Sequence, residues 1–410
     1  MTLSPRPALF LALALLLGGC AGRAHGVMSA TAPLVPGASK VEMLVATTRD
    51  VQNPPQGDLY TGERGAHMSF ADIAISIPND SVRQIGEVQF PQSLPPDPTR
   101  EFATLSVASL NAEGALGLLN RRLATTPRRQ VLVFVHGYNT RFDDAVYRLA
   151  QFVHDSGTTA LPVLFTWPSR GKTAAYGYDR ESTNYSRDQL EKVLQALDRD
   201  KSVGEISVLA HSMGNWVTLE ALRQMAIRNG RIAPKIRNVI LAAPDVDYDV
   251  FLQQVREMKT PPSLFTVFVS KDDEALGVSR RLWGDRPRLG AIDPESEPFK
   301  TELADAHILA VDITNNKSDD PVNHSKFARS PDVVRDIGRR LAAPGQMLAE
   351  QRSGLGDKVG AVAVGAAATV GSAASVAVSA PFAIVDPNTR ENMGDQLEQL
   401  GGHVGDTVGY

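Results

Sequence analysis

A histidine, a serine and a glycine follow a run of strand-forming aliphatic residues in the stretch VLAHSMGNWV, residues 208–217. A serine hydroxyl is a poor nucleophile at neutral pH, and it needs a nearby base and hydrogen-bond donors for an oxyanion. A tight strand-to-helix turn presents such a serine and directs helix N–H groups at it. The turn needs small residues two positions away on either side, here Ala210 and Gly214. Ala210 replaces the usual glycine, but the pattern still predicts Ser212 as a nucleophile.

A base for this serine is expected after the last strand, following the chain order Ser…Asp/Glu…His. The polar loop NNKSDDPVNHSKFARSP carries His324 at that place. His307 is the competitor, but it stands at the start of an apolar strand, where a histidine more often belongs to the core. We therefore predict His324 as the base. His211 adjoins Ser212 and cannot turn back to reach it, so we expect it to shape the turn.

Two loops offer the carboxylate that would fix the tautomer of the histidine and stabilise the imidazolium. The stretch VFVSKDDEAL contains Asp272 and Asp273, and AAPDVDYDVF contains Asp245 after the preceding strand. Both loop positions are used among hydrolases. We favour Asp273 and keep Asp272 and Asp245 as alternatives.

The donors for the oxyanion are expected from two backbone N–H groups. Met213 follows the serine at the start of the next helix. His136 and Gly137 end the earlier apolar run QVLVFVHG, and this pair resembles an oxyanion loop in which the N–H of the next residue, Tyr138, is a donor. The His136 side chain itself is expected to brace loops. No Cys/His spacing typical of zinc and no phosphate-binding glycine loop is present in the sequence, so we expect no metal and no cofactor.

Strand-like and helix-like segments alternate from about residue 130 onward, which predicts a mostly parallel sheet with helices on both faces. Sites in such sheets lie at the carboxyl ends of the strands. Five polar loops should therefore share one rim: 136–139, 167–171, 211–214, 243–247 and 270–273. Earlier strands are expected at 41–47 and 71–78. Ser186 is expected to cap one helix, and Pro331 to open the last one.

The amino terminus has the pattern of a secreted lipoprotein. A basic Arg6 precedes a short apolar run, and LGGC resembles a lipobox in which Cys20 becomes lipidated. Ala21 then suggests sorting to the outer membrane, facing the periplasm. The expected organisation is a signal peptide at 1–19, a flexible tether at 20–40, the hydrolase domain at 41–342 and an Ala/Gly-rich extension at 343–410. The formal charge of −4, without a basic stripe, argues against a nucleic-acid partner.

Over residues 40–342 the chain resembles the alpha/beta-hydrolase superfamily, and within it a bacterial esterase/lipase-like family of unknown function. The motifs that carry the resemblance are MLVATTR, VFVHGYNTRFDDA, FTWPSRG, YDRESTNYSRDQLE, LAHSMGNW, LAAPDVD, SKDDEALGVSRRLWG and NHSKF. The resemblance implies the alpha/beta-hydrolase fold and supports Ser212, His324 and Asp273 as a triad. It names no substrate.

The function expected from these patterns is a membrane-anchored serine hydrolase that cleaves carboxylic esters of a small molecule or lipid. The alternative is an envelope lipoprotein that transfers acyl groups or uses the fold only for binding. Trp167, Tyr138 and Trp216 could line an acyl pocket or belong to the core. The segment 277–303 could be a lid or a long connection. The sequence indicates no particular protein partner.

Overall fold

The computed structural model describes residues 24–29, 31–52, 58–259 and 264–342. The expected signal peptide, Cys20 and the extension at 343–410 lie outside the described residues. Within these ranges, no helix is both long enough and apolar enough to cross a membrane.

One sheet of nine strands forms the centre of the fold, in the order β3-β2-β1-β5-β4-β6-β7-β8-β9. β2 pairs antiparallel with both β1 and β3, and every other neighbouring pair is parallel. The predicted alpha/beta-hydrolase fold class, a mostly parallel sheet, is confirmed. The strands are β1 Ser39–Val51, β2 Tyr60–Ile77, β3 Ala103–Leu110, β4 Gln130–Val135, β5 Leu161–Thr166, β6 Glu205–His211, β7 Ile236–Ala242, β8 Phe265–Val269 and β9 Leu309–Asp312.

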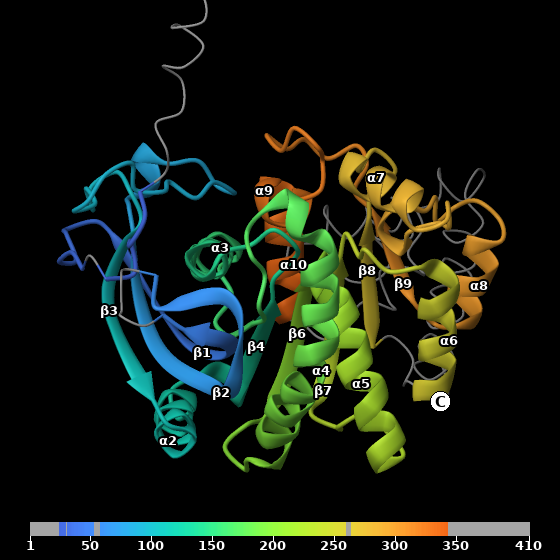
Figure 1. Ribbon diagram of the computed structural model, residues 1–410, viewed down its shortest axis with the longest axis horizontal. Coiled ribbons are helices and arrows are strands. Elements are labelled where there is room, and N and C mark those ends of the chain that lie inside the picture. The colour runs from blue at the N-terminus through green and yellow to red at the C-terminus, as the bar shows by residue number, and fades with distance from the viewer. Residues whose placement is uncertain (1–23, 30, 53–57, 260–263, 343–410) are drawn as a thin grey trace, which may run out of the picture. The chain divides into compact units, whose positions relative to one another are not determined.

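Helices cover both faces of the sheet (Figure 1). In β4, Val133 and Val135 pack toward the helices of one face, and Leu132 and Phe134 pack toward those of the other. Because side chains alternate along a strand, an uninterrupted apolar run such as β4 is buried on both faces. One face carries α3 Phe142–Ser156, α9 Lys326–Arg329 and α10 Pro331–Ala342; the other carries α2 Ala112–Leu123, α4 Tyr176–Arg199, α5 Gly214–Asn229 and α6 Tyr248–Met258.

The strand register brings the predicted loops to one edge. Val135 of β4 lies level with Ala210 of β6, and Ala242 of β7 lies level with both His211 and Phe268. The loops that follow β4, β6, β7 and β8 therefore leave the sheet side by side. This edge carries the candidate site.

One helix prediction and one loop prediction need correction. Ser186 does not cap a helix: α4 begins ten residues earlier, and the buried Ser186 hydroxyl bonds to Thr48 Oγ1 at 2.8 Å. The polar stretch before it hides the helix, because its buried positions are filled by hydroxyl and carboxylate groups. The segment 277–303 is not one long loop either, since it contains the end of α7 Glu274–Leu282 and most of α8 Phe299–Asp305.

Residues 24–29 lie against the sheet instead of forming the predicted tether. Val27 and Met28 are both buried, and Thr104 Oγ1 donates to the Val27 carbonyl at 2.8 Å. The prediction of a flexible segment over 20–40 is therefore wrong for this part. Two apolar residues among small and polar neighbours produce no periodic pattern, so the sequence contained no signal of this packing.

Candidate active site

Ser212 occupies a strained turn between β6 and α5. Its φ is 53°, a left-handed conformation that residues other than glycine rarely adopt. The turn is held by a bond from Ser212 N–H to the Ala242 carbonyl at 3.0 Å. A Cβ at Gly214 would lie 2.3 Å from the His136 carbonyl oxygen, so this position requires glycine. Ala210, which departs from the usual glycine, fits as a fully buried residue.

The loop after β4 lies directly against the serine. A Cβ at Gly137 would be 2.8 Å from the Ser212 Cβ, so only glycine allows this approach. The next N–H along the chain belongs to Tyr138, and Met213 supplies the N–H at the start of α5. Within the described ranges, neither N–H donates to a protein acceptor. Two N–H groups on segments that meet at Ser212 are thus free for an oxyanion.

His324 and Asp273 are in direct contact. His324 Nδ1 lies 2.7 Å from Asp273 Oδ2, and the Asp273 side chain is fully buried. The other carboxylate oxygen, Oδ1, accepts the Leu276 N–H at 2.9 Å, so Asp273 also caps α7. The two bonds hold the carboxylate in place and leave Nε2 of His324 for proton transfer.

The two alternative carboxylates have other partners. Asp272 pairs with Lys326 Nζ at 2.8 Å. Asp245 accepts the Tyr176 hydroxyl at 2.7 Å and the Ser279 hydroxyl at 2.6 Å. Of the three predicted acids, Asp273 is therefore the one that contacts the histidine.

His211, which directly precedes Ser212, contacts His324. The His211 Nε2 donates to the His324 carbonyl at 3.1 Å, and the two rings lie 4.9 Å apart. Burial holds the pKa of His211 well below its usual value, so the ring is a neutral donor. No hydrogen bond joins the Ser212 hydroxyl to His324 in the part of the chain that the structure describes. Catalytic hydrogen bonds in unliganded enzymes are often long and tighten when substrate binds.

The competing histidine lies elsewhere. His307 is exposed and shortly precedes β9, so it lies at the amino ends of the parallel strands. The candidate site lies at their carboxyl ends.

Of the three aromatic residues that could line an acyl pocket, Trp167 is completely buried, and its Nε1 donates to the His136 carbonyl at 2.9 Å. Tyr138 and Trp216 remain partly exposed.

His136 braces the loop, as predicted from its position. Trp167 N–H donates to His136 Nε2 at 3.1 Å, and the ring therefore carries its proton on Nδ1, which donates to the Gly137 carbonyl at 2.8 Å. Burial and the nearby charge of Arg49 lower the pKa of His136 to about 3. The ring stays neutral throughout the physiological pH range.

Arg49 holds the same loop and was not among the predicted site residues. Its buried guanidinium donates to the Thr140 carbonyl and the Ser169 carbonyl, both at 2.8 Å, and to Thr166 Oγ1 at 2.8 Å. Burial lowers its pKa to about 10, so the cation persists at neutral pH. Arg49 belongs to the quoted motif MLVATTR, but one arginine in a strand carries no spacing signal of its role.

Asp179 fastens the loop from the other side. It accepts the Asn139 N–H at 3.2 Å and the Ser169 hydroxyl at 2.5 Å. Burial raises its pKa, although hydrogen bonds from Ser169, Arg170 and Asn139 oppose this effect. A cation and a carboxylate thus fix the backbone that carries the Tyr138 N–H.

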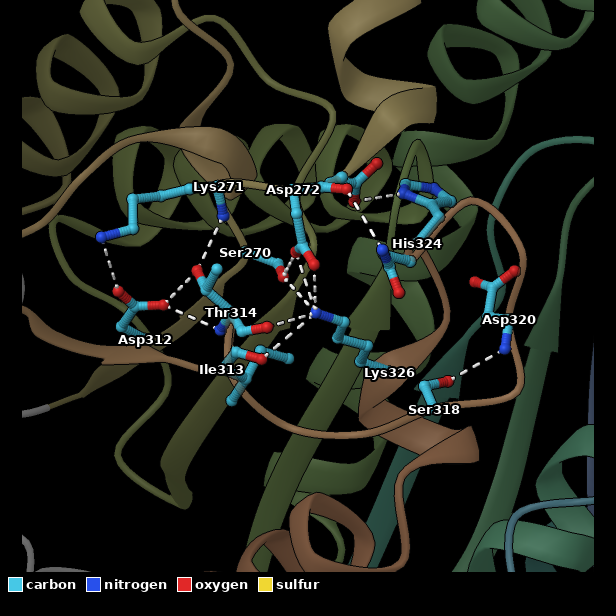
Figure 2. Close-up of polar contacts among 12 residues, drawn as sticks. Ser270, Lys271, Asp272, Asp312, Ile313, Thr314, Ser318, Asp320, His324 and Lys326 are labelled. Atoms are coloured by element: carbon cyan, nitrogen blue, oxygen red, sulfur yellow. Dashed lines mark hydrogen bonds and ion pairs between the residues drawn. The ribbon is translucent and has the colours of Figure 1, made fainter.

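Lys326 joins the segments that carry His324 and Asp273 (Figure 2). Its ammonium group is buried and donates to Asp272, to Ser270 Oγ at 3.1 Å and to the Thr314 carbonyl at 2.7 Å. Lys326 follows His324 by two residues, and Asp272 directly precedes Asp273. The ion pair therefore sets the distance between the histidine loop and the loop after β8.

No cluster of three or more His, Cys, Asp or Glu side chains that could hold a metal ion occurs within the described residues.

The pH dependence of ester hydrolysis should report the Asp273–His324 contact. Burial lowers the pKa of His324, but the charge of Asp273 and its hydrogen bond outweigh burial and place the pKa above the ordinary 6.5. Since only neutral His324 can accept a proton, kcat/KM for p-nitrophenyl acetate should rise with pH through a limb above 6.5. Asp273→Asn should move this limb to lower pH and reduce kcat by about 10³–10⁴-fold.

Asp319→Asn is the matched control, because it removes an exposed carboxylate from the same loop as His324. Its pH profile should match that of the wild type. An acid limb that stays in place in Asp273→Asn would contradict the pairing.

The Lys326 ion pair should affect both activity and stability. Lys326→Met removes the donor that Lys326 Nζ provides to Asp272, Ser270 Oγ and the Thr314 carbonyl, which should lower the free energy of unfolding by about 1–3 kcal/mol. Without the ion pair, the His324 loop and the loop after β8 should lose their fixed spacing. This loss should lower kcat/KM by about 10- to 100-fold, because catalysis is sensitive to small displacements of the reacting groups. Urea unfolding and ester kinetics measure the two effects.

Lys300→Met is the control, since Lys300 pairs with Glu295 on the exposed surface at 3.2 Å. It should change the free energy of unfolding by less than about 1 kcal/mol. Folded Lys326→Met protein with wild-type kcat/KM would show that the ion pair does not position the histidine.

Comparisons with known proteins identify the family of the chain. The family model described as "Alpha/beta hydrolase of unknown function" (DUF900) matches residues 113–341, more than half of the chain. A search of curated proteins found no match.

Two solved structures are distantly similar. A fungal esterase from Rhizomucor miehei shares 11% identity at a TM-score of 0.33, covering 76% of this chain and 85% of its own. The Fe-lacking apo form of ESTFA shares 12% identity at a TM-score of 0.32, covering 83% and 98%. At such TM-scores neither likeness bears on the residues of the site. The family model covers more than half of the chain, and the chain therefore belongs to the alpha/beta hydrolases of unknown function (DUF900).

Proposed function

We propose that this alpha/beta hydrolase is a serine hydrolase that cleaves carboxylic esters through Ser212, His324 and Asp273. The observation that carries the proposal is the 2.7 Å contact between His324 and a buried Asp273, beside a serine held at a φ of 53°. A histidine oriented by a carboxylate next to a strained serine is the arrangement that activates a hydroxyl nucleophile.

The proposed reaction begins when Ser212 Oγ attacks the ester carbonyl carbon while His324 Nε2 takes the hydroxyl proton. The carbonyl oxygen becomes an oxyanion, which accepts hydrogen bonds from the Met213 and Tyr138 N–H groups. When the C–O bond to the alcohol breaks, His324 returns the proton to the leaving oxygen. Water then attacks the acyl-enzyme with His324 again as base, and this step releases the acid and restores Ser212.

A covalent probe tests this function. A fluorophosphonate should label the wild-type protein and inhibit hydrolysis of p-nitrophenyl butanoate. Ser212→Ala should abolish labelling and lower kcat by at least about 10³-fold, since the nucleophile is lost.

Ser207→Ala is a useful control, because Ser207 is buried in β6, away from the rim. The fluorophosphonate should still label Ser207→Ala. A folded wild-type protein that is not labelled would reject the proposal.

We also propose that the protein is anchored to the membrane by a lipid on Cys20. The support for this anchor is the run LGGC, which resembles a lipobox ending in Cys20. Lipidation at Cys20 would place the hydrolase domain, residues 41–342, at the periplasmic face of the outer membrane. An enzyme held there would meet esters of lipids or of small envelope molecules.

Metabolic labelling tests the anchor. In a Gram-negative host, the full chain should incorporate labelled palmitate and sediment with membranes. Cys20→Ser should lose the label and enter the soluble fraction, because it lacks the thiol that carries the lipid. Wild-type protein without palmitate would contradict the anchor and leave the hydrolase proposal standing.

A further inference from the structure

An arginine on the rim lies close to the candidate site without a carboxylate partner. The Arg180 guanidinium carbon lies 3.5 Å above the centre of the Trp216 ring. Trp216 is four residues after Ser212, in the first turn of α5, and its Nε1 donates to Asn184 at 3.3 Å. α4 and α5 both start at the edge of the sheet where β5 and β6 end, so Arg180 lies at the rim that carries the serine.

Aromatic side chains connect Arg180 to the oxyanion loop. Tyr176, one helical turn before Arg180, packs edge-on against Tyr138 with ring centres 5.0 Å apart. The Tyr176 hydroxyl bonds to Asp245, whose backbone N–H donates to the Ser212 carbonyl at 3.3 Å. Arg180 and these rings therefore lie on the same rim of the sheet as Ser212.

Two carboxylates, Asp245 and Glu181, act electrostatically on Arg180, but neither forms an ion pair with it among the described residues. Asp245 accepts bonds from Tyr176 and Ser279 and lies 3.5 Å from Arg288 Nε. Across the described ranges, Arg180 forms no ion pair within 4.0 Å, and its closest polar contact is the Thr183 hydroxyl at 3.4 Å. Burial lowers its pKa, with Arg288 adding to that effect and Tyr176 and Asp245 opposing it.

A half-buried guanidinium over an aromatic ring is well suited to bind an anion. The ring holds the planar group in one orientation, and partial burial strengthens its attraction for negative charge. Arginine donates in a fixed fork that matches the oxygens of a carboxylate or phosphate.

We propose that Arg180 is a specificity residue that binds an anionic carboxylate or phosphate group on the ester substrate. The inference rests on the proposed ester hydrolysis at Ser212, and it names the substrate class of that site: esters with a negative charge in the acyl or the alcohol portion.

Two matched substrate pairs test this proposal. Mono-p-nitrophenyl adipate is compared with p-nitrophenyl heptanoate, which places the charge on the acyl side. 4-(Butanoyloxy)benzoate is compared with its methyl ester, which places the charge on the alcohol side. For each pair, the ratio of kcat/KM for the anionic ester to kcat/KM for the neutral ester is measured in wild type and variants.

Arg180→Met should lower this ratio by about 10- to 100-fold in at least one pair, the loss expected for a hydrogen-bonded charge pair. Arg180→Lys should restore part of it, because the charge returns without the fork. Arg187→Met is the control on the same helix. Arg187 is partly exposed and lies near Asp188 and Glu220, so the ratio should not change.

An unchanged ratio in both pairs would overturn the inference, and so would an equal loss of activity toward both members of each pair. The failure of the proposed function looks different. In that case the folded wild type would hydrolyse neither the neutral nor the anionic esters and would resist the fluorophosphonate.

Discussion

The fold depends at its rim on one steric constraint: the end of β4 and the turn after β6 approach each other so closely that two glycines are required. The carbonyl of His136 occupies the space that a side chain at Gly214 would fill, and Gly137 leaves room for the Ser212 side chain. The left-handed backbone conformation of Ser212 costs about 1–3 kcal/mol of folding free energy. Packing and the bond from Ser212 N–H to Ala242 offset this cost.

Buried charges hold the surrounding loops around this turn. Arg49 and Asp179 bind the backbone of the oxyanion loop, and Lys326 joins the histidine loop to the loop after β8. Each of these groups makes several short hydrogen bonds, which a buried charge needs because it has lost its water. These bonds fix the backbone that carries the proposed oxyanion donors and the loop that carries the proposed base, and such preorganisation lowers the reorganisation needed during a reaction.

Much of this arrangement could be predicted from the sequence. Uninterrupted apolar runs such as β4 indicate strands buried on both faces, and the carboxyl ends of parallel strands then bring distant loops together. Periodic patterns of this kind identify the strands that carry Ser212 and His136. The order of the chain also indicates that a late histidine, His324, belongs with them.

Other features leave no trace in a single sequence. The choice among Asp273, Asp272 and Asp245 depends on which carboxylate faces the histidine, and adjacent residues such as Asp272 and Asp273 point to different partners. The early start of α4 is hidden because polar groups such as Asp179 and Ser186 fill its buried face. The roles of Arg49 and Arg180 depend on tertiary contacts, which residue spacing does not encode.

A crystal structure of the protein after reaction with a fluorophosphonate would test the proposed triad and oxyanion donors together. We expect a covalent bond from Ser212 Oγ to phosphorus, with the phosphoryl oxygen accepting hydrogen bonds from the Met213 and Tyr138 N–H groups. His324 should keep its bond to Asp273 and lie within hydrogen-bond distance of the Ser212 oxygen. An adduct on another residue, or a phosphoryl oxygen turned away from both N–H groups, would contradict the proposed arrangement.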